Sequence, residues 1–235
     1  VKAHALEGTV AVQADQSEGE TRFLLELANQ HPFIKGVVGW LDLRSPSIES
    51  RLEHFSQFRK LKGLRHVVQA EPTGFLLHPD FQRGIAALRT YSYTYDILIR
   101  EHQLEEAIAF VTMFPEQKFV VDHIAKPNIR NGNRSAWSKQ MTELAKRSNV
   151  LCKLSGMVTE ADWKNWKRAD FTPYLDLVVN AFGTQRVMYG SDWPVCLVAG
   201  TYADQFSIVE EFLAPFSDSE KQAILGENAV RFYNL

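Results

Sequence analysis

Short apolar runs rich in β-branched residues alternate with helical patterns along nearly the whole chain of 235 residues. The runs predict strands at Thr9–Gln13, Gly36–Leu43, Leu64–Gln69, Tyr95–Ile99, Phe119–Ile124, Val150–Ser155 and Val187–Gly190. Helical periodicity predicts helices at Glu20–His31, Ile48–Phe58, Asp80–Leu88, Leu104–Met113, Ala136–Lys146, Pro173–Phe182, Tyr202–Leu213 and Asp218–Tyr233. Such regular alternation is typical of a parallel sheet covered by helices.

Seven strand–helix units are one short of a closed (β/α)8 barrel of the TIM type, which needs eight strands and about 250 residues. The missing unit is expected at the front, because the chain starts abruptly at Val1-Lys2-Ala3-His4, whereas extra helices follow the last strand. We therefore predict a single α/β barrel domain over residues 1–235, N-terminally incomplete, with an open seam between the first and seventh strands. A doubly wound open sheet is the alternative, but no glycine-rich phosphate loop follows the first strand.

The composition excludes several classes of protein. A formal net charge of −2 offers no basic surface for nucleic acid or an anionic membrane, and no apolar run approaches the ~20 residues that span a bilayer. The two cysteines are not spaced as a redox or zinc pair, which favours a reducing, cytoplasmic location. Motifs of serine hydrolases, nucleotide enzymes and zinc proteases are also absent from the sequence.

Two strings carry the strongest chemical signal, Val-Val-Asp-His-Ile-Ala-Lys-Pro at 120–127 and Met-Tyr-Gly-Ser-Asp-Trp-Pro at 188–194. Each is a strand-like run that ends in His123 or Asp192 and is stopped by a proline. Barrel enzymes build their active sites at the carboxyl ends of the strands, so Asp192 is a candidate base or metal ligand and His123 a candidate ligand or carbonyl polariser. The alternatives are a hydrogen-bonded core histidine and a turn-capping aspartate. Strand alternation predicts that His123 shares the face of Phe119 and Val121.

Arg65 and His66 are neighbours in a predicted strand and cannot both point inward. Either Arg65 and Gln69 face the lumen, or His66 does. A guanidinium in the lumen suits the oxygen atoms of a substrate, whereas a surface ion pair at the strand end is equally compatible with the sequence.

Three further residues are candidates for substrate binding. Lys126 follows His123 and is expected at the barrel rim. Lys153 lies within an apolar strand, where a charged side chain needs a partner; Asp192 or a substrate oxygen would supply one, and snorkelling at the outer strand end is the alternative. Trp193 follows Asp192 and could form one wall of a pocket, although most tryptophans serve packing.

Several strings together resemble the amidohydrolase-related family, in particular its sugar-lactone hydrolase branch of L-fuconolactonase- and L-rhamnonolactonase-like enzymes. The matching strings, in the family's order, are Leu-Arg-His-Val-Val-Gln at 64–69, Tyr-Asp-Ile-Leu at 95–98, Val-Asp-His-Ile-Ala-Lys-Pro at 121–127, Lys-Leu-Ser-Gly at 153–156, Tyr-Gly-Ser-Asp-Trp-Pro at 189–194 and Gly-Glu-Asn-Ala-Val-Arg-Phe-Tyr at 226–233. The resemblance implies a distorted β/α barrel that opens a small carbohydrate or carboxylate lactone with water. Asp192 would be the base, and His123 the carbonyl polariser or metal ligand.

The family opens with a strand ending in His-x-His, and no His-x-His occurs in this sequence. Members differ in metal use, so the resemblance is compatible with one divalent ion such as zinc, held by His123 and Asp192, and also with metal-independent hydrolysis. The expected partner is a small-molecule lactone or sugar acid. A metal-dependent decarboxylase or amide hydrolase of the same fold is an alternative, as is a catalytically silent barrel that binds a ligand.

Overall fold

The computed structural model describes residues 6–235, so the abrupt start at Val1–His4 lies outside the described residues. Its sheet contains β1 (Thr9–Val12), β2 (Ile34–Gly39), β3 (Leu61–His66), β4 (Thr94–Ile97), β5 (Phe119–Val121), β6 (Val150–Leu154) and β7 (Val187–Tyr189). The seven strands are all parallel and lie in chain order from β1 to β7. Within residues 6–235, β1 and β7 are the two edge strands and do not pair with each other. The predicted open seam is therefore confirmed.

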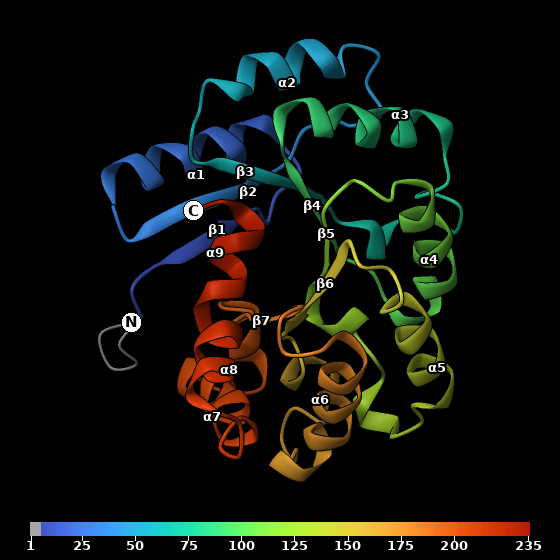
Figure 1. Ribbon diagram of the computed structural model, residues 1–235, viewed down its shortest axis with the longest axis vertical. Coiled ribbons are helices and arrows are strands. Elements are labelled where there is room, and N and C mark those ends of the chain that lie inside the picture. Colours follow the sequence, from blue (N-terminus) through green and yellow to red (C-terminus); the bar gives the residue numbers. More distant parts are fainter. Residues whose placement is uncertain (1–5) are drawn as a thin grey trace.

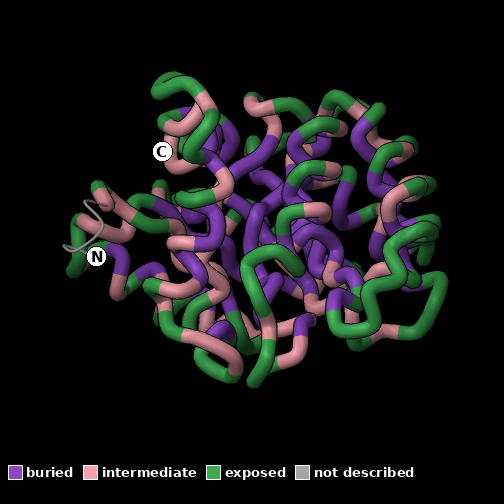
Figure 2. The backbone as a smooth tube through the Cα atoms, turned by 90° about the horizontal axis from the view of Figure 1, so that it is seen from below, coloured by how far each residue is buried: buried purple, intermediate pink, exposed green. Residues whose placement is uncertain are grey.

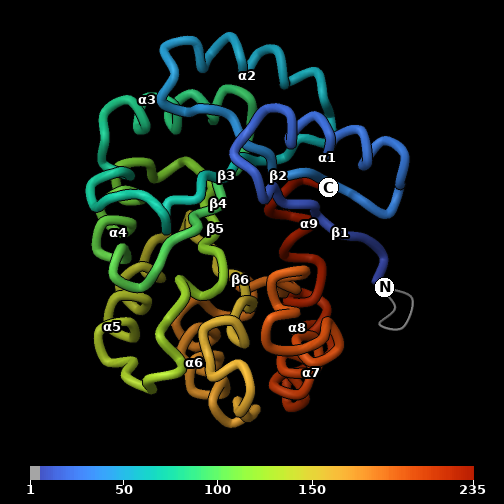
Figure 3. Tube along the Cα trace, turned by 180° about the vertical axis from the view of Figure 1, so that it is seen from behind, coloured from blue at the N-terminus to red at the C-terminus, as the bar shows by residue number. Residues whose placement is uncertain are grey.

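The sheet curls into an incomplete barrel, whose interior we call the lumen, and most helices form an outer layer, as in a TIM-type barrel that lacks one unit (Figures 1 and 3). The helices are α1 (Glu18–Gln30), α2 (Ile48–Ser56), α3 (Pro79–Leu88), α4 (Leu104–Met113), α5 (Ser135–Leu144), α6 (Arg168–Phe182), α7 (Tyr202–Phe212), α8 (Asp218–Gln222) and α9 (Asn228–Tyr233). A π-helical turn over Ala223–Glu227 joins α8 to α9. Among the described helices, none combines the length and the apolar character that crossing a membrane requires.

Local sequence explains the helix boundaries. The Ser17 side chain accepts from the Glu20 amide and begins α1, whose buried residues Thr21, Leu25 and Ala28 recur at helical spacing. The helix predicted to begin at Pro173 instead begins at Arg168, because the Asp170 carboxylate accepts from the Lys167 amide and Phe171 is buried. The proline is accommodated inside α6.

Side chains on the inner face of the sheet lie in two layers. An apolar layer consists of Val38, Val120, Met188, Phe232 and Tyr233, all buried. The last two residues belong to α9, whose C-terminal end reaches β1 and β2 (Figures 1 and 3). The α9 helix therefore helps to fill the lumen beside the open seam. Along the whole chain, the inner backbone is mostly buried and the outer turns are exposed (Figure 2).

The second layer lies nearer the carboxyl ends of the strands and is charged. We call Arg65, Asp96, Asp122 and Lys153 the charged layer. They come from β3, β4, the turn after β5, and β6. On the opposite face of the same strands, residues such as Tyr95, Val121 and Cys152 pack into the main core beneath the helices. Strand alternation thus separates a lumen of mixed chemistry from an apolar outer core.

Candidate functional site

The chain leaves β5 in a turn of unusual backbone conformation. Four consecutive residues, 123–126, have positive φ values of 53°, 47°, 59° and 47°. Residues other than glycine seldom adopt this left-handed region. The turn is held by burial of Ile124 and Ala125 and by the Trp137 indole, which donates to the Ile124 carbonyl at 2.8 Å. Strand pairing stops at Val121, so the prediction that His123 continues the alternation of Phe119 and Val121 is wrong; the turn sets its direction.

A glycine makes room for His123. Gly156 follows β6 with φ +68°, and a Cβ at this position would lie 2.5 Å from the Cβ of His123. The neighbouring Ser155 hydroxyl lies 2.8 Å from His123 Nδ1. The segment after β6 therefore orients the imidazole that the turn after β5 supplies.

His123 and Asp192 come together at the carboxyl ends of β5 and β7. Nε2 of His123 lies 3.5 Å from Oδ1 of Asp192, and the Thr159 hydroxyl lies 3.5 Å from Oδ2 of the same carboxylate. Both side chains are largely buried, at 12% and 7% exposure. Asp192 also has a positive φ of 53°, so both members of the pair sit in left-handed backbone.

Burial sets the protonation of this pair. It lowers the pKa of His123 to about 3, which outweighs the nearby negative charge of Asp122 and leaves the ring neutral. It also raises the pKa of Asp192 to about 6, against the opposing effect of Lys126. A carboxylate whose pKa lies close to neutrality is a suitable general base. When Ser155 donates to Nδ1, the single proton of the neutral ring is on Nε2 and faces Asp192.

The charged layer lies beneath the pair. Asp122 accepts from Arg65 at 2.8 Å and contacts Lys153 at 2.7 Å, while Lys153 also donates to Asp96 at 2.5 Å. The Tyr233 hydroxyl donates to the same Asp96 oxygen at 2.7 Å. The carboxylates that pair with Lys153 are thus Asp96 and Asp122, not the Asp192 that the sequence suggested.

Burial and neighbouring positive charges have opposing effects on the pKa values of Asp122 and Asp96. Burial alone would raise the pKa of Asp122, but the positive charges of Lys153 and Arg65 outweigh it and hold that pKa below the usual range. For Asp96, burial dominates over Lys153 and its pKa is raised.

Of the sequence neighbours Arg65 and His66, Arg65 faces the lumen, where it also donates to the Gln13 carbonyl. His66 points to the other side of the sheet. Its ring stacks on Phe75 at 4.6 Å, and Nε2 lies 2.8 Å from Glu71. The structure therefore brings together Arg65, Asp122 and Lys153, and leaves His66 in a separate aromatic cluster.

Two rim residues differ in exposure. Trp193 is adjacent to Asp192 in sequence but is 61% exposed, among other exposed apolar residues such as Leu197. Lys126 is only 12% exposed at its side chain and lies 3.8 Å from Glu160, which Arg100 approaches at the same distance. We call Arg100, Lys126 and Glu160 the rim cluster.

Sequence reasoning missed Asp96, Asp122, Ser155 and the two remaining members of the rim cluster. A usable signal existed for Asp96, which lies in the apolar string Thr-Tyr-Asp-Ile at 94–97. The desolvation argument applied to Lys153 holds equally for a carboxylate in a strand. Asp96 and Lys153 carry opposite charges, so an ion pair between them would compensate both buried charges.

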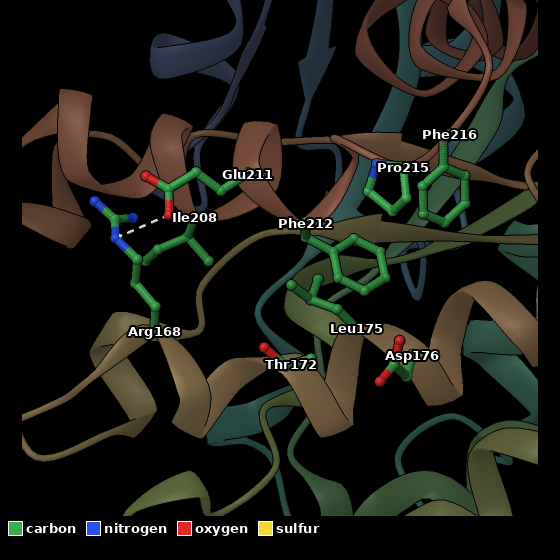
Figure 4. Close-up of a pocket in the computed structure, with 9 residues that line it drawn as sticks. All are labelled: Arg168, Thr172, Leu175, Asp176, Ile208, Glu211, Phe212, Pro215 and Phe216. Atoms are coloured by element: carbon green, nitrogen blue, oxygen red, sulfur yellow. Dashed lines mark ion pairs between the residues drawn. The ribbon is translucent and has the colours of Figure 1, made fainter.

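A separate groove of about 380 Å³ lies between α6 and α7 on the outer wall (Figure 4). Leu175, Ile208 and Phe212 line it, and the ion pair of Arg168 with Glu211, at 3.1 Å, crosses one end. It contains none of the residues at the strand ends, so the candidate active site is the lumen mouth around His123 and Asp192.

The amidohydrolase family model matches residues 1–235, the whole chain. The chain belongs to the amidohydrolase family. A 41% identical relative is the L-fucono-1,5-lactonase of Burkholderia multivorans, with 99% of this chain and 82% of the relative aligned. The L-fucono-1,5-lactonase of Burkholderia ambifaria is 33% identical, over 97% of this chain and 80% of that protein. A crystal structure of a Burkholderia multivorans amidohydrolase with bound zinc superposes with a TM-score of 0.96 at 40% identity, covering 100% of this chain and 85% of that one.

A bound zinc ion in the Burkholderia multivorans structure raises the question of whether the residues here could hold one. Over residues 6–235, no three His, Cys, Asp or Glu side chains are arranged to hold a metal ion. His123 and Asp192 supply two donors, whereas a catalytic zinc site commonly uses three protein ligands. The described donor set does not fit a zinc site.

Proposed function

We propose that this amidohydrolase hydrolyses the cyclic ester of a sugar acid. The buried pair of neutral His123 and Asp192, 3.5 Å apart at the carboxyl ends of the strands, is the observation that carries the proposal. The names of the two Burkholderia relatives support a sugar lactone as the substrate. The site offers no comparable support for a metal-dependent decarboxylase or amide hydrolase, or for a catalytically silent barrel.

In the proposed reaction, Asp192 accepts a proton from water while the water oxygen attacks the lactone carbonyl carbon. The carbonyl oxygen gains negative charge and is stabilised by the Nε2–H of His123 and by the positive charge of Lys126. The bond between the carbonyl carbon and the ring oxygen then breaks. The ring oxygen leaves as a hydroxyl group after receiving the proton from Asp192, so the carboxyl group returns to its charged form.

Three other candidates have supporting roles in this proposal. Arg65 and Lys153 belong to the charged layer and fix the position of Asp122, the residue before His123. Trp193 borders the mouth, where an exposed ring offers an apolar surface to a sugar. A role for His66 would be indirect, through Glu71 and Trp40, which its two ring nitrogens contact.

The test is direct. The purified protein is mixed with L-fucono-1,5-lactone and L-rhamnono-γ-lactone, and acid release is followed with a pH indicator against the uncatalysed rate. We expect turnover of at least one lactone and its loss in Asp192→Asn. Acid release no faster than in buffer for a panel of sugar lactones would overturn the proposal.

A further inference from the structure

Two cations and one carboxylate meet beside the proposed catalytic pair. The ammonium of Lys126 lies 3.8 Å from Oε1 of Glu160, and a guanidinium nitrogen of Arg100 lies 3.8 Å from Oε2. Charge-assisted hydrogen bonds are about 2.7–2.9 Å long, so both contacts are loose. Among the described residues, neither cation has a nearer carboxylate. The cluster carries one excess positive charge and N–H groups that Glu160 does not occupy.

The cluster lies where the reaction would produce charge. Thr159, the residue before Glu160, reaches the Asp192 carboxylate, and Lys126 is the strongest opposing influence on the raised pKa of Asp192. The Lys126 and Glu160 side chains are 12% and 16% exposed, whereas that of Arg100 is 49% exposed. The cluster therefore extends from the catalytic pair to the solvent.

Hydrolysis changes the charge of the ligand. A sugar lactone is neutral, whereas its ring-opened acid carries one negative charge at the former carbonyl carbon. A subsite with an excess positive charge distinguishes these two states, and a carboxylate already within it weakens the binding of a second one. Glu160 would therefore limit how tightly the product is retained.

We propose, on the basis of the lactone hydrolysis inferred above, that Arg100 and Lys126 bind the carboxylate of the ring-opened sugar acid and that Glu160 is the internal counter-ion which this carboxylate displaces. Arg100 and Glu160 are then specificity-determining residues for product over substrate. The two should act in opposite directions on product affinity.

The experiment compares Arg100→Gln, Glu160→Gln and the control Arg89→Gln. Arg89 forms an exposed ion pair with Glu116 before β4 begins, at the opposite end of the strands. The dissociation constant of L-fuconate is measured by calorimetry. The product-inhibition constant of L-fuconate and the KM for L-fucono-1,5-lactone are measured in the turnover assay, and thermal unfolding verifies each fold.

We expect Arg100→Gln to weaken L-fuconate binding about tenfold, because charge-assisted hydrogen bonds are lost, with a smaller effect on KM. Glu160→Gln should tighten L-fuconate binding several-fold, and Arg89→Gln should leave it unchanged. A purely structural role of Glu160 would instead weaken binding in both variants of the cluster, which would overturn the inference.

A wild-type protein that hydrolyses the lactone but binds no L-fuconate up to about 10 mM would also overturn it. If no lactone is hydrolysed, the proposed function fails separately. The order of the three L-fuconate dissociation constants then still decides whether the rim cluster binds a carboxylate.

Discussion

Replacing Lys153 with methionine should destabilise the protein strongly. The Lys153 ammonium lies 2.5 Å from Asp96 and 2.7 Å from Asp122, and both carboxylates are fully buried. After the substitution, Asp122 keeps Arg65, but Asp96 keeps only the hydroxyl of Tyr233. Breaking a buried ion pair by removing one partner costs about 3–5 kcal/mol.

For a domain of this size, 1 kcal/mol shifts the melting temperature by about 2–4 °C, so the expected fall is about 6–20 °C. Urea unfolding and thermal unfolding measure the loss. The matched control is Lys146→Met, which removes an ion pair of similar length, 2.6 Å from Glu143, but with 65% and 41% of the two side chains exposed. Exposed pairs contribute about 0–1 kcal/mol, so the control should change little.

The loss should also depend on pH. Burial raises the pKa of Asp96 and Lys153 opposes this effect, so removing Lys153 raises the pKa of Asp96 further in the folded state. A carboxyl whose pKa is raised in the folded state lowers stability once the pH exceeds its pKa in the unfolded chain, and this cost grows until the pH passes the folded pKa. The deficit should therefore be larger at pH 8 than at pH 5. A deficit below about 1 kcal/mol at both pH values would refute the view that Lys153 compensates two buried charges.

Four further outcomes are expected at the site. Asp192→Asn should lower kcat by about 10²–10⁴ without lowering the melting temperature, because the amide cannot accept the proton of water. In the wild type, kcat/KM should rise with pH and level off above about 6, where Asp192 is ionised; a profile already flat between pH 4 and 5 would contradict this assignment. Ser155→Ala should reduce kcat/KM about tenfold with unchanged circular dichroism, because His123 loses its hydrogen bond at Nδ1. Tyr233→Phe should cost about 1.5–3 kcal/mol in urea unfolding, because buried Asp96 loses a donor.

Strand–helix alternation was sufficient to predict the architecture. The helix predicted at Leu104–Met113 has these bounds in the structure, and the open seam follows from the strand count. The meeting of His123 and Asp192 followed from one rule, that parallel strands bring their carboxyl ends together. These features depend on periodicity and topology, which a single sequence encodes directly.

Pairings between distant strands could not be predicted in the same way. Lys153 needed a carboxylate, and the sequence places several in comparable positions. The choice of Asp96 and Asp122 over Asp192 depends on the depth of each residue in the lumen. Asp96 and Lys153 are inside strands and Asp122 directly follows one, whereas Asp192 lies beyond the end of β7. Depth along the barrel therefore separates the charges paired inside the lumen from the carboxylate that we propose as the base.

The direction of His123 was unpredictable for a different reason. Local propensity argues against a left-handed Ile124, because a β-branched residue with positive φ is a clear outlier. Residues held in such regions cost about 1–3 kcal/mol each and persist only where the surrounding structure determines them. Here burial of Ile124 and Ala125 and the Trp137 hydrogen bond supply that support. The same turn carries both His123 and Lys126, and Asp192 opposite is left-handed as well. Backbone strain is thus concentrated in the two segments that hold the proposed base, polariser and cation. This distribution is expected when the strain serves to position reactive groups and not merely to connect a strand with the next helix.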